Sequence, residues 1–184
     1  KGLEYVLYNK EAKDALLERS QLHKLVSHNT WIFGDEYYLV NNDESLTNVL
    51  RKHIKNVTFE KDDVDTETPV VREDGSEGVV DIGLSNIPPA DALRSEQDVV
   101  VAKILNRQPT EGRHHLVIEL KRPSKKITTD VLAQTESYAF AIARDERFQG
   151  VNTAWTFWAL SNEMTDEARF KTEQSDRPRG MVYQ

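Results

Sequence analysis

The sequence predicts a layered α/β or α+β domain; the order of its predicted helices and strands supports the fold class, and two further observations support a globular protein without a membrane span. Apolar runs of strand length alternate with segments of helical periodicity, a pattern typical of sheets covered by helices. Hydrophobic residues make up 38% and charged residues 30% of the 184 positions, which suits a globular core beneath a polar surface. The longest apolar runs, such as residues 154–160, are far too short to cross a bilayer. We therefore expect one domain, or one domain with an appended helical lobe, and no membrane partner.

The N-terminal part of the chain predicts two helices joined by a bulky turn. A first helix is expected over residues 11–28, where Ala15, Leu22 and Val26 share a face. A second, short helix with one apolar side is expected over residues 45–56. We expect residues 1–58 to form a helical and strand segment packed on a core of residues 59–184.

Four apolar runs then predict strands, and one long helix is predicted between the last two of them. Pro123 ends the third strand, and Thr128, Thr129 or Asp130 is expected to cap a helix that runs to about Asp145. A polar, arginine-rich tail follows the last strand. The predicted strands lie at residues 79–84, 99–105, 115–121 and 154–160.

The third strand carries a carboxylate and an ammonium among branched apolar residues. Side chains alternate along a strand, so Val117, Glu119 and Lys121 share one face. Burying either charge without a partner is costly, which favours a functional role. Asp81 lies on the strand before, and Gly83 is expected to leave room beside its carboxylate. The alternatives are a structural ion pair for Glu119 and Lys121 and a loop-capping role for Asp81.

These residue types suit a metal-dependent phosphodiesterase. The carboxylates of Asp81 and Glu119, with the backbone carbonyl of Leu120, are hard oxygen ligands that suit Mg²⁺ or Mn²⁺. Such an ion polarises a phosphate and lowers the pKa of a bound water. Lys121 would position or help deprotonate the attacking water. Glu119-Leu120-Lys121 is a short pattern, and its context, after an Asp-bearing strand and before a helix, supports the interpretation.

The helix that follows adds a possible third element of the site. Gln134 and Tyr138 are four residues apart and therefore share a helix face. A glutamine and a tyrosine facing the active strand could orient Lys121 or bind a substrate phosphate. Ordinary amphipathic packing is the alternative for this pair.

The charge of the chain is unevenly distributed. The net charge of −7 argues against a general nucleic-acid coat protein. Residues 59–77 hold eight acids, whereas residues 113–126 hold five Lys or Arg side chains against one Glu. This predicts a local grip on a polyanion beside the carboxylates, with a solvated strand end as the alternative. The expected DNA-binding residues are Arg122, Lys125 and Lys126, together with Arg144 and Arg147.

Several other classes of site are disfavoured. The chain has no cysteine, which excludes disulfides and thiolate metal sites and favours a reducing cytoplasmic location. His114 and His115 point to opposite faces of a strand. His23 and His28 are five apart on a helix and have no evident partner, so a zinc site is not expected. The glycines form no phosphate-binding loop, so any ATPase or sensor domain would be fused or separate. Because the chain begins at Lys1, we expect a piece excised from a longer protein.

The pattern Asp81…Glu119-Leu120-Lys121, followed by Gln134-x-x-x-Tyr138, resembles the PD-(D/E)XK nuclease superfamily, with a helix motif similar to its RecB-type branch. A closer resemblance is to the Shedu nuclease domain of prokaryotic anti-phage defence. It is carried by two N-terminal patterns, Glu18-x-x-Gln21-Leu22 and Asn29-x-Trp31-Ile32-Phe33-Gly34.

The resemblance implies a central mixed β-sheet flanked by helices, with a restriction-endonuclease-like core, and Mg²⁺-dependent cleavage of DNA by a homo-oligomer. It also implies that Glu18 supplements the metal site, for which a surface ion pair is the alternative. Val80 stands in place of the proline that names the superfamily. The long interval from Asp81 to Glu119 implies an insertion at about residues 86–112, which leaves Asp98 as another possible ligand. Two rival interpretations are a catalytically silent nuclease-like binding module and an acidic protein-interaction domain.

Overall fold

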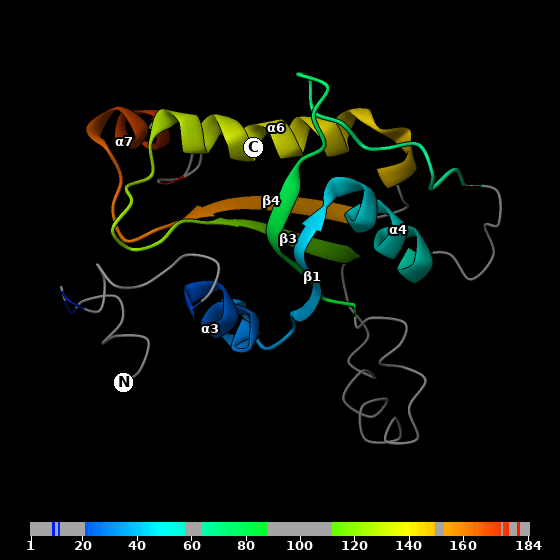
Figure 1. Ribbon diagram of the computed structural model, residues 1–184, viewed down its shortest axis with the longest axis horizontal. Helices are drawn as coiled ribbons and strands as arrows, with labels where there is room; N and C mark the ends of the chain where they lie inside the picture. Colours follow the sequence, from blue (N-terminus) through cyan, green and yellow to red (C-terminus); the bar gives the residue numbers. More distant parts are fainter. Residues whose placement is uncertain are drawn as a thin grey trace.

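The structure is a computed structural model and describes residues 9, 11, 21–57, 64–87, 112–149, 153–173, 175–176 and 180, with only the backbone at 56 and 57. Its helices and strands follow one another in the order shown in Figure 1. They are α3 (His23–Ser27), η2 (Thr30–Phe33), β1 (Tyr38–Ser45), α4 (Leu46–Val57), β2 (Val79–Ser85), β3 (Arg113–Leu120), α6 (Thr129–Arg144), η4 (Glu146–Phe148), β4 (Thr153–Leu160) and α7 (Asp166–Thr172).

The four described strands form one mixed sheet in the order β1-β2-β3-β4. β1 pairs with β2 and β2 with β3 in antiparallel fashion, whereas β3 and β4 are parallel. A parallel pair requires a long crossover connection, and α6 provides it here. The α+β class, with a mixed sheet flanked by helices, is thereby confirmed.

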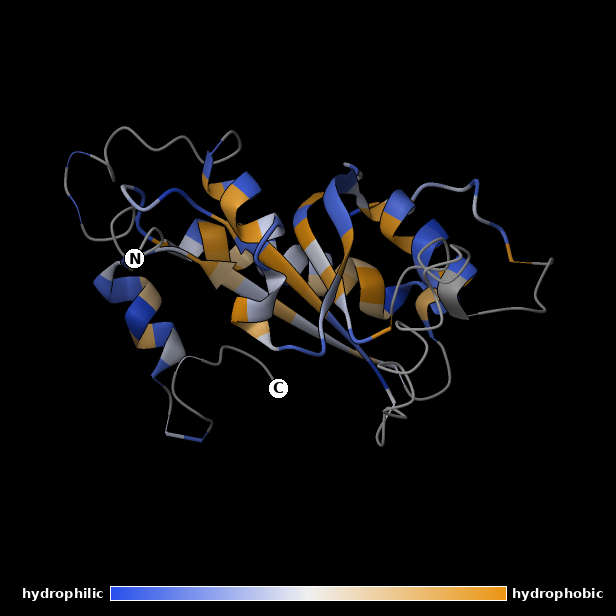
Figure 2. Ribbon diagram, turned by 90° about the horizontal axis from the view of Figure 1, so that it is seen from below, coloured by the Kyte–Doolittle hydropathy of each residue, from blue (hydrophilic) through white to orange (hydrophobic). Residues whose placement is uncertain are grey.

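Helices cover both faces of this sheet. Figure 1 shows α6 and α7 above the strands and α3 below them. Val117 of β3 belongs to the core that α4 and α6 cover, and its neighbour Ile118 belongs to the core that α3 covers. The alternation predicted for this strand is therefore confirmed. Figure 2 shows the apolar residues concentrated along the strands and on the helix surfaces beside them.

α6 begins and ends where local chemistry favours it. The hydroxyl of Thr128 accepts a hydrogen bond from the backbone N–H of Val131, which caps the first turn. Asp130 lies in the first turn and Arg144 in the last, where each charge complements the helix dipole. The prediction of a capped helix ending near Asp145 is confirmed. This rigid element carries both polar helix residues of the predicted site.

Other predicted elements have mixed outcomes. The helix expected over residues 45–56 and the strand over 79–84 are confirmed within one residue. The expected polar tail instead contains α7, whose first turn is capped by the Thr165 hydroxyl. That cap, followed by Asp166 and Glu167, is a helix-start signal that the prediction overlooked. α3 lies within the range 11–28 where a helix is expected. The strand expected over 99–105 lies outside the described residues.

Candidate active site

The two predicted carboxylates lie on neighbouring strands, where the ladder between β2 and β3 ends. Ile82 opposite Ile118 is the last paired position, and Asp81 and Glu119 each come one residue beyond it. There the backbone N–H of Leu120 donates to Oδ2 of Asp81 at 2.8 Å, in place of a ladder bond. Asp81 and Glu119 are only 4% and 3% exposed. Two ionisable carboxyl groups are thus buried together at one end of the sheet.

Glu119 is held by two donors on one of its oxygens. Lys121 Nζ lies 2.5 Å from Oε1, and Gln134 Nε2 donates to the same atom at 2.9 Å. The other oxygen, Oε2, is buried and has no hydrogen-bond partner within the described part of the chain. A buried anionic oxygen without a partner is costly. Oε2 of Glu119 is therefore a buried acceptor that no described donor satisfies.

Gln134 and Tyr138 continue the network from α6. Gln134 Nε2 donates to the Tyr138 hydroxyl at 2.7 Å as well as to Glu119. Burial raises the pKa of Tyr138 to about 12, and the nearby charge of Glu119 contributes to the rise. The phenol therefore stays protonated at neutral pH. The structure joins the predicted helix pair to Glu119 in one chain of hydrogen bonds.

Gly78 explains how the tyrosine ring reaches this position. A Cβ atom added at Gly78 would lie 2.7 Å from the Tyr138 ring, closer than packed carbon atoms approach. The ring therefore lies directly against the backbone that leads into β2. This contact was not visible in the sequence, because it joins residues 60 positions apart.

The interpretation that Gly83 leaves room beside Asp81 is wrong, and His23 has an unexpected role there. Gly83 does not leave space beside the Asp81 carboxylate, because a Cβ there would lie 2.8 Å from Cβ of Asn41, which occupies that space from β1. His23, for which no partner was evident, is buried, and its Nε2 lies 2.8 Å from the backbone oxygen of Asp81. α3 thus braces the Asp81 backbone from the opposite face of the sheet.

The described residues offer some, but not all, of the oxygen ligands that Mg²⁺ or Mn²⁺ prefers. No cluster of three or more His, Asp or Glu side chains suited to a metal occurs among the described residues, and Glu18 lies outside them. Asp81, Glu119 and the Leu120 carbonyl are nevertheless hard oxygen ligands. The buried Oε2 of Glu119 is the kind of atom that a cation would satisfy. The residues therefore fit a partial ligand set that further oxygen donors would complete.

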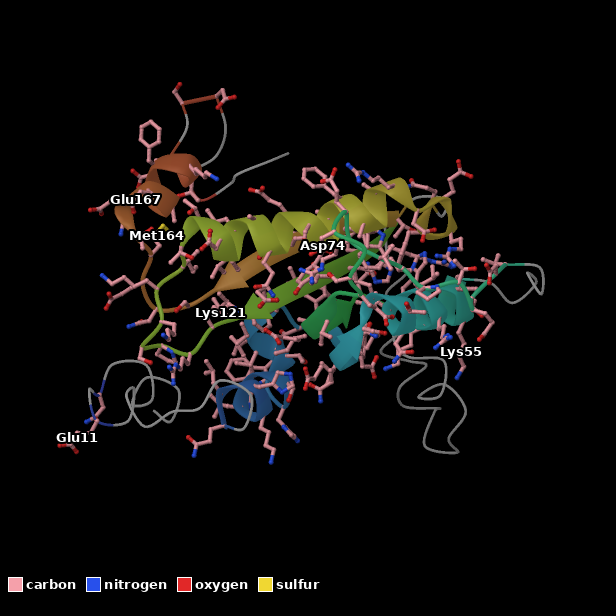
Figure 3. All side chains as sticks on the ribbon, turned by 45° about the horizontal axis from the view of Figure 1, so that its top comes forward. Glu11, Lys55, Asp74, Lys121, Met164 and Glu167 are labelled. Carbon is pink, nitrogen blue, oxygen red and sulfur yellow. The ribbon has the colours of Figure 1, made fainter. Side chains whose placement is uncertain are left out.

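Lys121 is the third member of the predicted set. Its side chain is 18% exposed, so the ammonium lies at the mouth of the buried carboxylates. Figure 3 shows Lys121 at the end of β3, beneath α6. The backbone N–H of Lys121 donates to the Leu160 oxygen of β4 at 2.8 Å, which anchors the residue to the sheet.

The predicted DNA-binding cations differ in how they are held. Arg122 is half-buried, whereas Lys125 and Lys126 are exposed on the connection from β3 to α6. Lys126 pairs with Glu163 at 3.2 Å. Arg144 lies on α6, with its guanidinium 3.7 Å from Glu73.

Arg147, one of the predicted DNA-binding cations, is bonded within the protein. Its guanidinium lies 2.6 Å from Asp145 and donates to the backbone oxygens of Asp65 and Thr68 at 2.9 and 2.8 Å. These bonds fasten the loop before β2 to the end of α6. Arg147 is therefore a structural tie, since Nε, Nη1 and Nη2 each donate to acceptors within the protein.

Comparisons with protein-family models, with curated proteins and with solved structures gave no match to this chain. Within the described ranges, no helix has both the length and the apolar character needed to span a membrane. The class of protein therefore rests on the fold and on the candidate site.

Proposed function

We propose that this chain is a metal-dependent endonuclease domain of the PD-(D/E)XK type that hydrolyses phosphodiester bonds in double-stranded DNA. The observation that carries the proposal is the buried carboxylate pair in which Glu119 Oε2 lacks a partner. Lys121 lies beside that pair at the solvent boundary. A mixed sheet with the polar residues where its strands separate supports a restriction-endonuclease-like core.

Asp81, Glu119 and the Leu120 carbonyl would hold Mg²⁺ or Mn²⁺, with Glu18 as a further proposed ligand. When bound, the ion supplies Lewis-acid polarisation of the phosphate and a lowered pKa of water. The protein residues supply orientation. Gln134 and Lys121 both donate to Oε1 of Glu119, which leaves the other oxygen for the ion.

Lys121 would act on the attacking water and on the charge that develops at phosphorus. A fixed cation beside a phosphate that gains negative charge lowers the barrier because it needs no reorganisation. Its proximity to Glu119 keeps Nζ directed toward the carboxylates. Tyr138 holds its proton and supports Gln134 from behind.

The wider setting is part of the same proposal. Arg122, Lys125 and Lys126 would contact the DNA backbone without reading sequence. The Shedu resemblance suggests prokaryotic anti-phage defence by a cytoplasmic homo-oligomer, with a fused or separate sensor or ATPase domain.

A second candidate is a catalytically silent nuclease-like fold that acts as a DNA-binding or protein-interaction module. The close approach of Lys121 to Glu119 favours it, since a buried ion pair of this kind also occurs for purely structural reasons. The two candidates differ in whether the protein cleaves DNA, which a cleavage assay measures.

The test is cleavage of plasmid and linear duplex DNA with Mg²⁺, Mn²⁺ or EDTA. We expect metal-dependent cleavage that falls by about a hundredfold to a thousandfold in Lys121→Ala, the size typical for loss of one group that stabilises transition-state charge. Lys171→Ala is the matched control, because Lys171 is exposed on α7. A folded protein that binds duplex DNA yet cuts none with any metal would favour the silent module.

A further inference from the structure

β4 forms an open edge of the sheet. It pairs with β3 on one side, and no described strand lies on its other side. The Leu160 oxygen accepts a hydrogen bond from the N–H of Lys121, so the backbone groups of Leu160 point toward β3. Backbone groups alternate sides along a strand, and every second residue therefore directs its N–H and C=O outward. The outward residues are Thr153, Trp155, Phe157 and Ala159.

The two edges of the sheet differ in how they are protected against pairing. β1, at the other edge, has a register shift between Leu39 and Asn41, a φ of 55° at Asp43, and adjacent charges at Asp43 and Glu44. Irregularity and charge are devices that keep edge strands from pairing with other chains. β4 pairs with β3 in continuous register over eight residues and contains no charged residue, proline or glycine. This contrast indicates that a further strand covers β4.

The face of β4 that points away from α6 is also uncovered. Ala154, Thr156 and Trp158 are exposed on it, whereas the alternate side chains pack toward the core beneath α6. Trp158 meets Phe33 in an edge contact with ring centroids 6.1 Å apart, yet it remains 45% exposed. The exposed face thus presents a small, an intermediate and a large side chain in order along the strand.

We propose that β4 pairs antiparallel with β4 of a second copy of this chain, about a two-fold axis at Thr156, so that two sheets join into one. In this register the outward backbone groups of Trp155 meet those of Phe157 in the other copy. Those of Thr153 meet Ala159 in the same way. Each copy thereby gains the ladder hydrogen bonds that its own sheet does not supply at this edge.

The side chains fit the same axis. Antiparallel pairing about Thr156 sets Trp158 of each copy opposite Ala154 of the other, so that a large ring covers a small side chain. Each chain carries a net charge of −7, but β4 has no charged side chain, so no like charges meet across the paired strands. This match of the strand to itself favours a second copy over an unrelated extended peptide.

The inference rests on the proposed function only in giving the expected homo-oligomer an interface. A two-fold axis that passes through the joined sheet leaves α6 of both copies on the same side. The two candidate active sites would therefore face the same way, and one duplex could contact both. Dimer formation itself is measured without cleavage.

Cysteine cross-linking tests the axis directly. The chain has no cysteine, so Thr156→Cys introduces a single thiol. A non-hydrogen-bonded antiparallel pair brings its Cα atoms to about 4.5 Å, which a disulfide can span. We expect mild oxidation to cross-link Thr156→Cys about a hundredfold faster than Asn42→Cys, because pairing raises the effective concentration of the second thiol. Asn42 is the matched control, since it is exposed on β1.

Sedimentation velocity over a range of protein concentrations measures the non-covalent dimer. We expect Thr156→Lys to weaken dimerisation by about a hundredfold or more, because it sets two ammonium groups opposite each other at the axis. Asn42→Lys adds the same charge at the other edge and should dimerise as the wild type does. Both positions are exposed, so neither lysine needs to be buried for the chain to fold.

The outcomes separate this inference from the proposed function. A wild type that stays monomeric would overturn the inference and leave the edge to a strand of another protein. A dimer that survives Thr156→Lys, or equal cross-linking of the two cysteine variants, would place the interface elsewhere and also overturn it. A dimer that depends on Thr156 would support the inference even if no metal yields cleavage, in which case the proposed function fails alone.

Discussion

The two ends of β3 each bury polar side chains on the same face of the sheet, yet they differ in how those groups are satisfied. At the start of the strand, His115 Nε2 and His53 Nδ1 lie 3.1 Å apart, and the His115 ring stacks on Trp155 at 4.2 Å. Burial lowers the pKa of His53 to about 4 and that of His115 to about 3, so both rings are neutral. At the other end, Glu119 retains an unpartnered carboxylate oxygen.

The comparison separates a structural polar cluster from a candidate site. The histidine end also has an unpartnered atom, the indole N–H of Trp155, but that group is neutral and its burial costs only about 1–3 kcal/mol. An ionised carboxylate costs far more to bury unless it is paired. Glu119 is paired with Lys121 through Oε1, but its Oε2 still lacks a donor or cation among the described residues. The buried histidines instead avoid a buried charge by staying neutral.

The largest expected effect concerns acid stability at the histidine end. Because both pKa values are depressed in the folded state, the unfolded chain binds more protons below the ordinary histidine pKa of 6.5. Stability should be intact above that value and decline as pH falls toward 4, by roughly 3 kcal/mol from His53 alone. Urea unfolding at neutral pH and near pH 4 measures this loss.

The matched variants make that prediction specific. The double variant His53→Leu/His115→Phe should lose much less stability on acidification than the wild type. His114→Leu is the control, because His114 is the exposed neighbour on the same strand. Equal acid sensitivity in all three proteins would show that the buried pair does not govern the pH dependence.

At the carboxylate end we expect stabilisation by metal. Mg²⁺ at about a hundred times its dissociation constant should raise the free energy of unfolding by about 2.7 kcal/mol, because the ion offsets the buried negative charge. Glu119→Gln should abolish this shift, while Glu163→Gln, an exposed carboxylate on the surface, should keep it. Thermal melting with and without Mg²⁺ gives the answer, and an undiminished shift in Glu119→Gln would place the metal elsewhere.

The smallest expected effect is at the tyrosine that supports the carboxylate network. Tyr138→Phe removes the acceptor of the Gln134 hydrogen bond and keeps the ring against Gly78. We expect the free energy of unfolding to fall by about 1 kcal/mol. The partly exposed Tyr37→Phe should change it by less than about 0.5 kcal/mol. A loss well above about 1 kcal/mol in Tyr138→Phe would show that the hydrogen bonds from Tyr138 through Gln134 to Glu119 stabilise the fold cooperatively.

Much of the fold was predictable because its signals are local. The alternation around Val117 and Ile118 predicted which residues of β3 face which core, and Thr128 marked the start of α6. α7 differs from the polar tail that the composition predicts, although its Thr165 cap is an equally local signal.

The candidate site was predictable only as a set of residue types. The sequence placed Asp81, Glu119 and Lys121 on strands and Gln134 and Tyr138 on one helix face. It did not show that Gln134 reaches Glu119, since that bond joins two elements through their packing. The hydrogen bonds of Arg147 could not be predicted either, because two of its acceptors lie about 80 residues away in the chain.

The sequence by itself determined the alternation of strands and helices, the capped helix α6, and the two carboxylates and lysine near one end of β3. Those features follow from periodicity, capping and side-chain chemistry, which act over a few residues. The tertiary structure alone decided that Gly83 accommodates Asn41, that His23 braces Asp81, that Arg72 lies over Tyr138, and that one oxygen of Glu119 is left without a partner. These outcomes depend on which distant surfaces share a limited space, and burial then determines which charges are satisfied.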